Sequence, residues 1–155
     1  DGFIPDMFRT YKEKKYMSVI DGDFDLGDGK DEEKMNKAFK DTFDFVKETL
    51  GDRVDVVKAT TKLKTHPVCL SSGEGITFEM EKYFTAVNPD LGMKAKRILE
   101  LNVDHDAFLA LDRARIDDPE RAKKMCEILL NQALMIAGLP IQDPSGYTDV
   151  VCSLF

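Results

Sequence analysis

Four acids near the N-terminus have a spacing that could bind calcium. They occupy the first, third, fifth and twelfth positions of an EF-hand loop, at Asp21, Asp23, Asp25 and Glu32. The sixth position is Leu26 where that motif needs a glycine for its sharp turn, and the residues before the loop favour a strand where the motif has a helix. We therefore expect a solvated acidic loop over residues 21–33 and no metal site.

The histidines could take part in metal binding or proton transfer. His66 and Cys69 are spaced like two zinc ligands, but no second pair completes the four that a structural zinc site needs. His105 could carry a proton, although such a residue is more often a partly exposed histidine at a helix start. Since there is no nucleophile elbow and no phosphate-binding glycine loop after a strand, we predict no catalytic, cofactor-binding or metal residue. An enzyme using either histidine stays open only as a third alternative.

Composition narrows the class of protein. The 155 residues suffice for one domain with a core, and 43% hydrophobic with 33% charged residues is typical of a globular protein. No apolar run approaches the ~18 residues of a membrane span, and no signal peptide opens the chain. The net charge of −7, most of it in the acidic loop, argues against nucleic-acid binding. Three widely spaced cysteines indicate reduced thiols and predict a cytoplasmic protein without membrane contact.

The hydrophobic pattern of the first two thirds of the chain predicts helices around a small three-stranded sheet. Expected helices cover residues 3–11, 33–50 and 75–87. A first strand is expected within 14–20, and the three sheet strands fall in 57–63, 68–70 and 97–101. The strand at 57–63 should bury alternate residues and present a basic face to water.

From residue 104 onward the pattern is helical. Asp104, Asp118 and Asp143 stand where N-caps belong, and the last two precede a proline suited to a first helical turn. The long helix that ends at Gly138 is apolar over more than one face, so it needs covering from two sides. We predict an intermolecular four-helix bundle in a homodimer, while the alternative is that both last helices fold back on the sheet. The predicted interface residues are Leu129, Leu130, Ala133, Leu134, Ala137, Tyr147, Val150, Val151, Leu154 and Phe155.

The expected helix 75–87 is unusually rich in aromatic and thioether side chains. Ile76, Met80, Tyr83, Phe84 and Val87 fall on one side of it, whereas Phe78 falls on the polar side. A helix between two strands normally packs such a stripe on the sheet.

Several stretches, in the same order along the chain, resemble the C-terminal domain of the bacterial HtpG chaperones of the ninety-kilodalton heat-shock family. They are GDRVDVVKATTKL, HPVCLSSGEG, FEMEKYF, KRILELNVDH and ILLNQALMIAGLPIQDP. The resemblance covers nearly the whole chain and weakens in the acidic loop. Val103 replaces a family proline, Ile76 stands where methionine is frequent, and Tyr83 stands where leucine is frequent.

The resemblance implies a mixed α/β dimerisation domain of an ATP-driven chaperone. Residues 1–103 would form an α/β subdomain with a projecting helix, and 104–155 a helical dimerisation region. The expected partners are a second copy and partly unfolded clients, whereas the ending VVCSLF lacks the EEVD tail that recruits helical-repeat co-chaperones. ATP and Mg²⁺ would bind an absent N-terminal domain, so this stretch should have no cofactor and no enzymatic activity.

The family's projecting helix has been proposed as a client-binding surface. Its apolar positions map onto Ile76, Met80, Tyr83 and Phe84, and we add Phe78 because we expect its ring to be exposed. The rival hypothesis is a free-standing adaptor whose apolar helix docks one specific partner.

Overall fold

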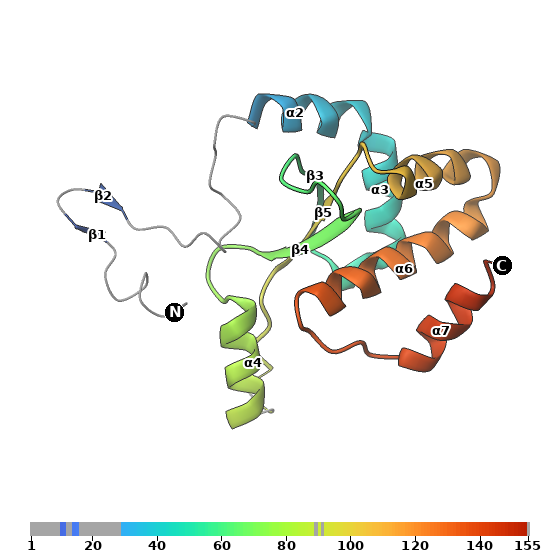
Figure 1. Cartoon of the computed structure of the whole chain (residues 1–155). Coiled ribbons are helices and arrows are strands. Elements are labelled where there is room, and N and C mark those ends of the chain that lie inside the picture. The colour runs from blue at the N-terminus through green and yellow to red at the C-terminus, as the bar shows by residue number, and fades with distance from the viewer. Residues whose placement is uncertain (1–9, 12–13, 16–28, 89, 91, 155) are drawn as a thin grey trace.

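The computed structural model describes residues 10–11, 14–15, 29–88, 90 and 92–154 (Figure 1). The acidic residues 21–28 lie outside the described residues, as do Phe155 and most of the helix expected at 3–11. The last two residues of that expected helix form a strand instead, because Thr10–Tyr11 (β1) pairs with Lys14–Lys15 (β2) in an antiparallel hairpin.

A three-stranded sheet lies at the centre of the fold, as predicted. Its strands are β3 (Val56–Ala59), β4 (Val68–Ser72) and β5 (Arg97–Leu101). The order is β3-β5-β4, with β3 parallel and β4 antiparallel to the central β5. Leu99 pairs with Val57 and Leu70, and Leu101 pairs with Ala59 and Val68, so these apolar residues share one face of the sheet.

Six α-helices surround this sheet in the described residues. They are α2 (Gly29–Ala38), α3 (Lys40–Leu50), α4 (Phe78–Val87), α5 (Asp106–Asp117), α6 (Pro119–Ile136) and α7 (Pro144–Cys152), with a short 3-10 turn, η1 (Gly51–Arg53), after α3. Figure 1 shows α3, α5 and α6 gathered on one side of the sheet, α7 beside α6, and α4 projecting away from the rest. The mixed α/β architecture is therefore confirmed.

The core forms between the apolar face of the sheet and α3, α5 and α6. Phe108 and Leu111 of α5 are fully buried there, together with Val46 of α3 and Leu130 of α6. Because α6 contacts β4, α3, α5 and α7, its broad apolar surface is covered from several sides within this chain.

The single helix expected over 33–50 is wrong in two respects. Helix begins at Gly29, inside the expected loop, and it breaks at Phe39 into α2 and α3. The Phe39 ring meets Phe108 edge to face, with ring centroids 5.1 Å apart. This contact joins residues far apart along the chain, which local periodicity does not predict.

The strand expected over 57–63 ends early, at Ala59, and two backbone amides at this end of the strand bind side chains of α2. The Ala59 amide donates to Asn36 Oδ1 at 2.8 Å, and the Thr61 amide donates to Glu32 Oε1 at 3.0 Å. Thr60 is buried, so the expected alternation fails there. Polar side chains of α2 thus satisfy the free edge of β3, as a neighbouring strand would.

Two of the three predicted N-caps are confirmed. The Asp118 side chain accepts from the Arg121 amide, and Asp143 accepts from the Gly146 amide. The N-cap predicted at Asp104 is wrong, because His105 Nδ1 caps α5 by accepting from the Ala107 amide at 3.0 Å.

Candidate interaction surfaces

Helix α4 begins with a local cap and ends without joining the core. Thr77 Oγ1 accepts from the Met80 amide at 3.3 Å, and two acids in the first turn suit the positive end of the helix dipole. Every residue of α4 keeps at least partial exposure, from Phe78 to Val87. An amphipathic helix of a globular domain normally buries its apolar side, so the orientation of α4 needs a separate explanation.

The polar side of α4 is the side that meets the body of the protein. Glu81 Oε1 accepts from Arg97 Nη2 at 2.6 Å, and Glu81 Oε2 accepts from the Ala95 amide at 2.7 Å. Lys82 Nζ donates to the carbonyl of Ala137, just past the end of α6, at 3.1 Å. Phe78 lies on this same side and packs against the core. The expectation that the Phe78 ring is exposed is therefore corrected, because the ring packs against the core at the start of the helix, while its contact with clients stays a prediction.

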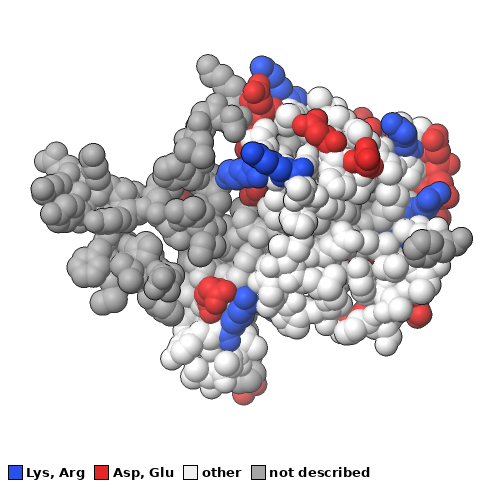
Figure 2. All heavy atoms as spheres, viewed as in Figure 1, with Lys and Arg blue, Asp and Glu red and all other residues white. Residues whose placement is uncertain are grey.

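The apolar side of α4 faces away from these anchors. Tyr83 is 57% exposed and Val87 is 65% exposed, while Met80 and Phe84 are partly exposed. The Tyr83 and Phe84 rings contact each other edge to face at 5.8 Å. Figure 2 shows that the visible face of α4 carries little charge away from its junction with the body. A helix that turns aromatic groups outward presents a candidate protein-contact surface.

The other members of this predicted site lie nearby. Ile76 is partly buried and stands just before the N-cap of α4. Met93, which the sequence did not single out, is 38% exposed in the segment that returns from α4 to β5. Neither Glu81 nor Lys82 was picked out either, although their position opposite the apolar stripe was the available signal.

The residues predicted at the dimer interface fall into two groups. Leu129, Leu130 and Ala133 lie in the core of the chain itself, with exposures of 5%, 2% and 0%. The others that the structure describes keep partial exposure: Leu134, Ala137, Tyr147, Val150, Val151 and Leu154. Next to them, at the end of α6, Met135 and Ile136 are 46% and 55% exposed. The apolar surface left for a second copy is therefore on α7 and the end of α6.

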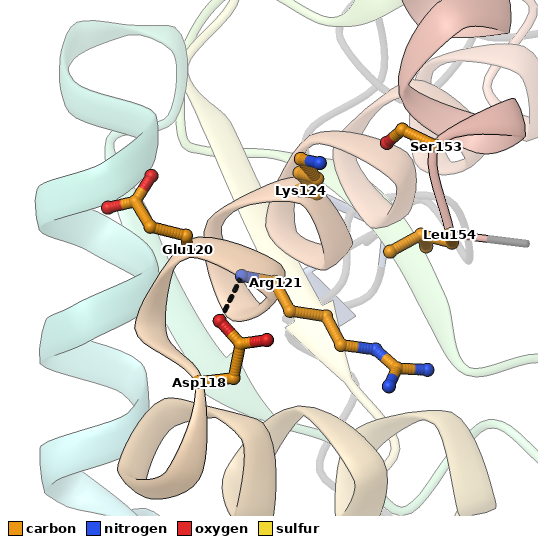
Figure 3. Close-up of a pocket in the computed structure, with 6 residues that line it drawn as sticks. All are labelled: Asp118, Glu120, Arg121, Lys124, Ser153 and Leu154. Atoms are coloured by element: carbon orange, nitrogen blue, oxygen red, sulfur yellow. Dashed lines mark hydrogen bonds between the residues drawn. The ribbon is translucent and has the colours of Figure 1, made fainter.

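The end of α7 returns to the start of α6, where a small hollow of about 220 Å³ opens. Figure 3 shows Arg121 and Lys124 of α6 on one side of it and Ser153 and Leu154 on the other. Its lining is mostly charged, whereas ligand pockets are usually larger and apolar. This hollow lies between the start of α6 and the end of α7, and its lining is a poor match for a small-molecule site.

A buried carboxylate on the second face of the sheet was not anticipated. Glu100 of β5 is 3% exposed, accepts from Ser71 Oγ at 2.7 Å, and lies 3.4 Å from Lys58 Nζ. Cys69 Sγ donates to Glu100 Oε2 at 3.9 Å. Burial and the nearby Glu100 charge raise the pKa of Cys69 to about 12, so this thiol is a poor nucleophile at neutral pH. The cluster stabilises the sheet face and does not resemble a catalytic site.

The two histidines considered as candidate chemical residues do not form a common site in the structure. His105 uses Nδ1 to cap α5, and His66 is exposed in the loop before β4. Within the described ranges no group of three or more histidine, cysteine or acidic side chains is placed to hold a metal ion. Among the helices of those ranges, none has the length and apolar character needed to cross a membrane.

Comparison with known proteins relates these surfaces to a family. The family model described as Hsp90 protein matches residues 1–155. The chain is 38% identical over 154 residues to the chaperone protein HtpG of Clostridium perfringens, and 41% identical over 155 residues to that of Clostridium acetobutylicum. The HtpG of Bacillus subtilis is 38% identical over 157 residues. Each match covers 99% of this chain, which spans 25% of the length of each of these relatives.

Proposed function

The chain belongs to the Hsp90 protein family of heat-shock chaperones, and on that premise we propose that it is the homodimerisation and client-contact domain of an ATP-dependent chaperone. Since the chain spans a quarter of its relatives' length, ATP and Mg²⁺ would bind elsewhere in the whole protein. Its partners would be a second copy and partly unfolded clients in the cytoplasm. This stretch would hold clients and join protomers without catalysing a reaction.

The outward apolar side of α4 is the observation that carries the client role. Tyr83 and Val87 are more than half exposed, while the polar side of the same helix is occupied by contacts to the body. Aromatic rings bury large areas at low rotamer cost, and thioethers such as Met80 and Met93 repack easily. These properties suit weak contact with many different unfolded segments.

The dimer role rests on the last two helices. Apolar side chains of α7 and of the end of α6 keep partial exposure, and two helices per chain would complete a four-helix bundle around a two-fold axis. Joining two arms at one end raises the effective concentration of each arm for the other. A dimerisation domain can in this way influence an ATPase that it does not contain.

An aggregation assay with several unrelated clients tests this proposal. We expect the chain to delay the aggregation of at least three chemically denatured proteins of unrelated sequence, and to sediment as a dimer in the micromolar range. Tight binding to a single protein with no effect on aggregation would support the adaptor hypothesis and contradict the client role. A monomer throughout that range would contradict the dimer role.

A further inference from the structure

Two neighbouring side chains of α4 reach different parts of the body. Glu81 binds the Arg97 guanidinium and the Ala95 amide, both in the segment that follows α4 in the chain. Both charged side chains are largely buried, with exposures of 12% for Glu81 and 19% for Arg97. This contact joins α4 to the strand that it leads into, which is a local connection.

Lys82 makes a long-range connection instead. Its ammonium donates to the carbonyl of Ala137, the C-cap of α6, at 3.1 Å, and to Glu79 Oε1 at 3.0 Å. The last carbonyls of a helix lack intrahelical donors, and a cation there also interacts favourably with the helix dipole. Lys82 thus serves as a C-terminal cap for α6, supplied from another helix.

The chain leaves room for this contact at Gly138. Its φ of +66° is one that other residues rarely adopt, and a Cβ at this position would lie 3.1 Å from Lys82 Nζ. Side chains larger than glycine would therefore strain the turn after α6 and also press on the lysine. Glycine at position 138 therefore allows both the turn after α6 and the approach of Lys82 to it.

Few other interactions fix the angle of α4. None of its residues is buried, and Phe78 at its first turn is the member that packs against the core. A helix that is attached through a few polar contacts and one packed ring can reorient at a lower cost in free energy than a helix with a buried face. The contacts of Glu81 and Lys82 therefore decide where the outward stripe points.

We infer that Lys82 is a positioning residue that ties the orientation of the outward face of α4 to the C-terminal end of α6. Because α6 and α7 form the proposed dimer surface, a shift at the end of α6 on dimerisation would be transmitted to α4. The link acts in both directions, since coupling between two sites is reciprocal. The effect of this link on client holding rests on the proposed function. The contact between Lys82 and Ala137 does not, because both residues lie in this chain.

Distances between spin labels on α4 and α6 test this inference. The labels are placed at Thr85→Cys and Lys123→Cys in a chain with Cys152→Ser. After dilution with unlabelled protein, they report the distance between these positions of α4 and α6 within one protomer. We expect one narrow distance distribution for the parent, and a shifted, broader one for Lys82→Met. Lys82→Arg should restore the narrow distribution. Glu79→Ala, which removes only the other acceptor of Lys82, should leave it unchanged.

Gly138→Ala provides an independent route to the same state, because it displaces the lysine without removing it. We expect it to broaden the distribution as Lys82→Met does, at a temperature where circular dichroism shows both variants folded. Distributions for Lys82→Met that match the parent would overturn the inference. If the distances shift as expected but substitutions on the outward face leave client holding intact, the positioning role stands and the proposed client function fails.

Discussion

Glu81 and Tyr83 lie two positions apart on α4 and face opposite ways. The Glu81 side chain is 12% exposed and binds Arg97, whereas Tyr83 is 57% exposed beyond the body of the protein. The usual arrangement of an amphipathic helix is therefore reversed, with the polar side attached and the apolar side free. This reversal leaves aromatic surface exposed on a projecting helix.

The outward face should contribute to client holding without contributing to stability. We expect Tyr83→Ser with Val87→Ser to weaken the suppression of client aggregation and to change the free energy of unfolding by less than about 0.5 kcal/mol. Ile116→Ser, at a residue of α5 that is 69% exposed, is the matched control and should leave suppression intact. Light scattering and urea denaturation provide the two readouts. Equal loss in both variants would mean that any exposed apolar group suffices.

Phe78 should show the opposite behaviour, because its ring packs against the core. We expect Phe78→Ala to lower the free energy of unfolding by about 1–2 kcal/mol, less than for a fully buried ring. Phe78→Leu, which keeps most of the apolar volume, should lose much less. A Phe78→Ala protein of unchanged stability that no longer holds clients would return this residue to the client surface.

The dimer surface should respond to a charge on α7. We expect Leu154→Glu to raise the dimer dissociation constant at least about tenfold, since desolvating an unpaired carboxylate costs more than about 1.4 kcal/mol. Sedimentation across a concentration series measures this. Ala38→Glu adds the same charge on exposed α2, far from α7 in Figure 1, and should change nothing. A charge at Leu130 would be a poor test, because that residue is only 2% exposed within the chain and its change would unfold the core.

The three thiols should differ in reactivity. Burial, with smaller effects of nearby Glu100 and Glu127 respectively, raises the pKa values of Cys69 and Cys126 to about 12, from an ordinary value near 9. Cys152 is exposed on α7. With a colorimetric thiol reagent near pH 8, we expect one fast-reacting group in the native chain and three after denaturation. Replacing Cys152 by serine should remove the fast phase, and a fast phase that survives would contradict the assignment.

These raised pKa values also predict the direction of a pH effect. The folded state keeps its two thiols protonated above the pH at which the unfolded chain loses those protons. The stabilisation is therefore present below about pH 9 and is lost as the pH rises toward 12. Denaturation curves between about pH 8 and 10.5 should show a smaller decrease for Cys69→Ser with Cys126→Ala than for the parent. The same decrease in both proteins would contradict this source of the effect.

Much of the fold was predictable because its signals are local. The strand at Arg97–Leu101 and the caps at Asp118 and Asp143 follow from apolar runs and from residue types at helix starts. The contact of Phe39 with Phe108, and the hydrogen bond from the Ala59 amide to Asn36 of α2, join residues that are far apart along the chain. Sequence periodicity carries no information about such partners.

The candidate site could be predicted only in part, because its local pattern is visible in the sequence and its contacts with the body are not. The stripe through Met80 and Tyr83 could be located from helical spacing, but spacing does not say which side of a helix meets the body. The polar neighbours of Phe78 predict an exposed ring, yet two of these neighbours, Glu81 and Lys82, bind the body of the protein. An apolar residue among charged ones marks the buried side here.

Site-specific photocrosslinking tests the central claim, that the free apolar side of α4 contacts clients, most directly. A photoreactive phenylalanine analogue at Tyr83 should crosslink to several denatured proteins of unrelated sequence. The same analogue at Thr85, an exposed residue of α4 on the side that carries Phe78, should give little product. We predict strong crosslinks from the first position and weak ones from the second. Equal yields from both positions, or none from Tyr83, would contradict the account.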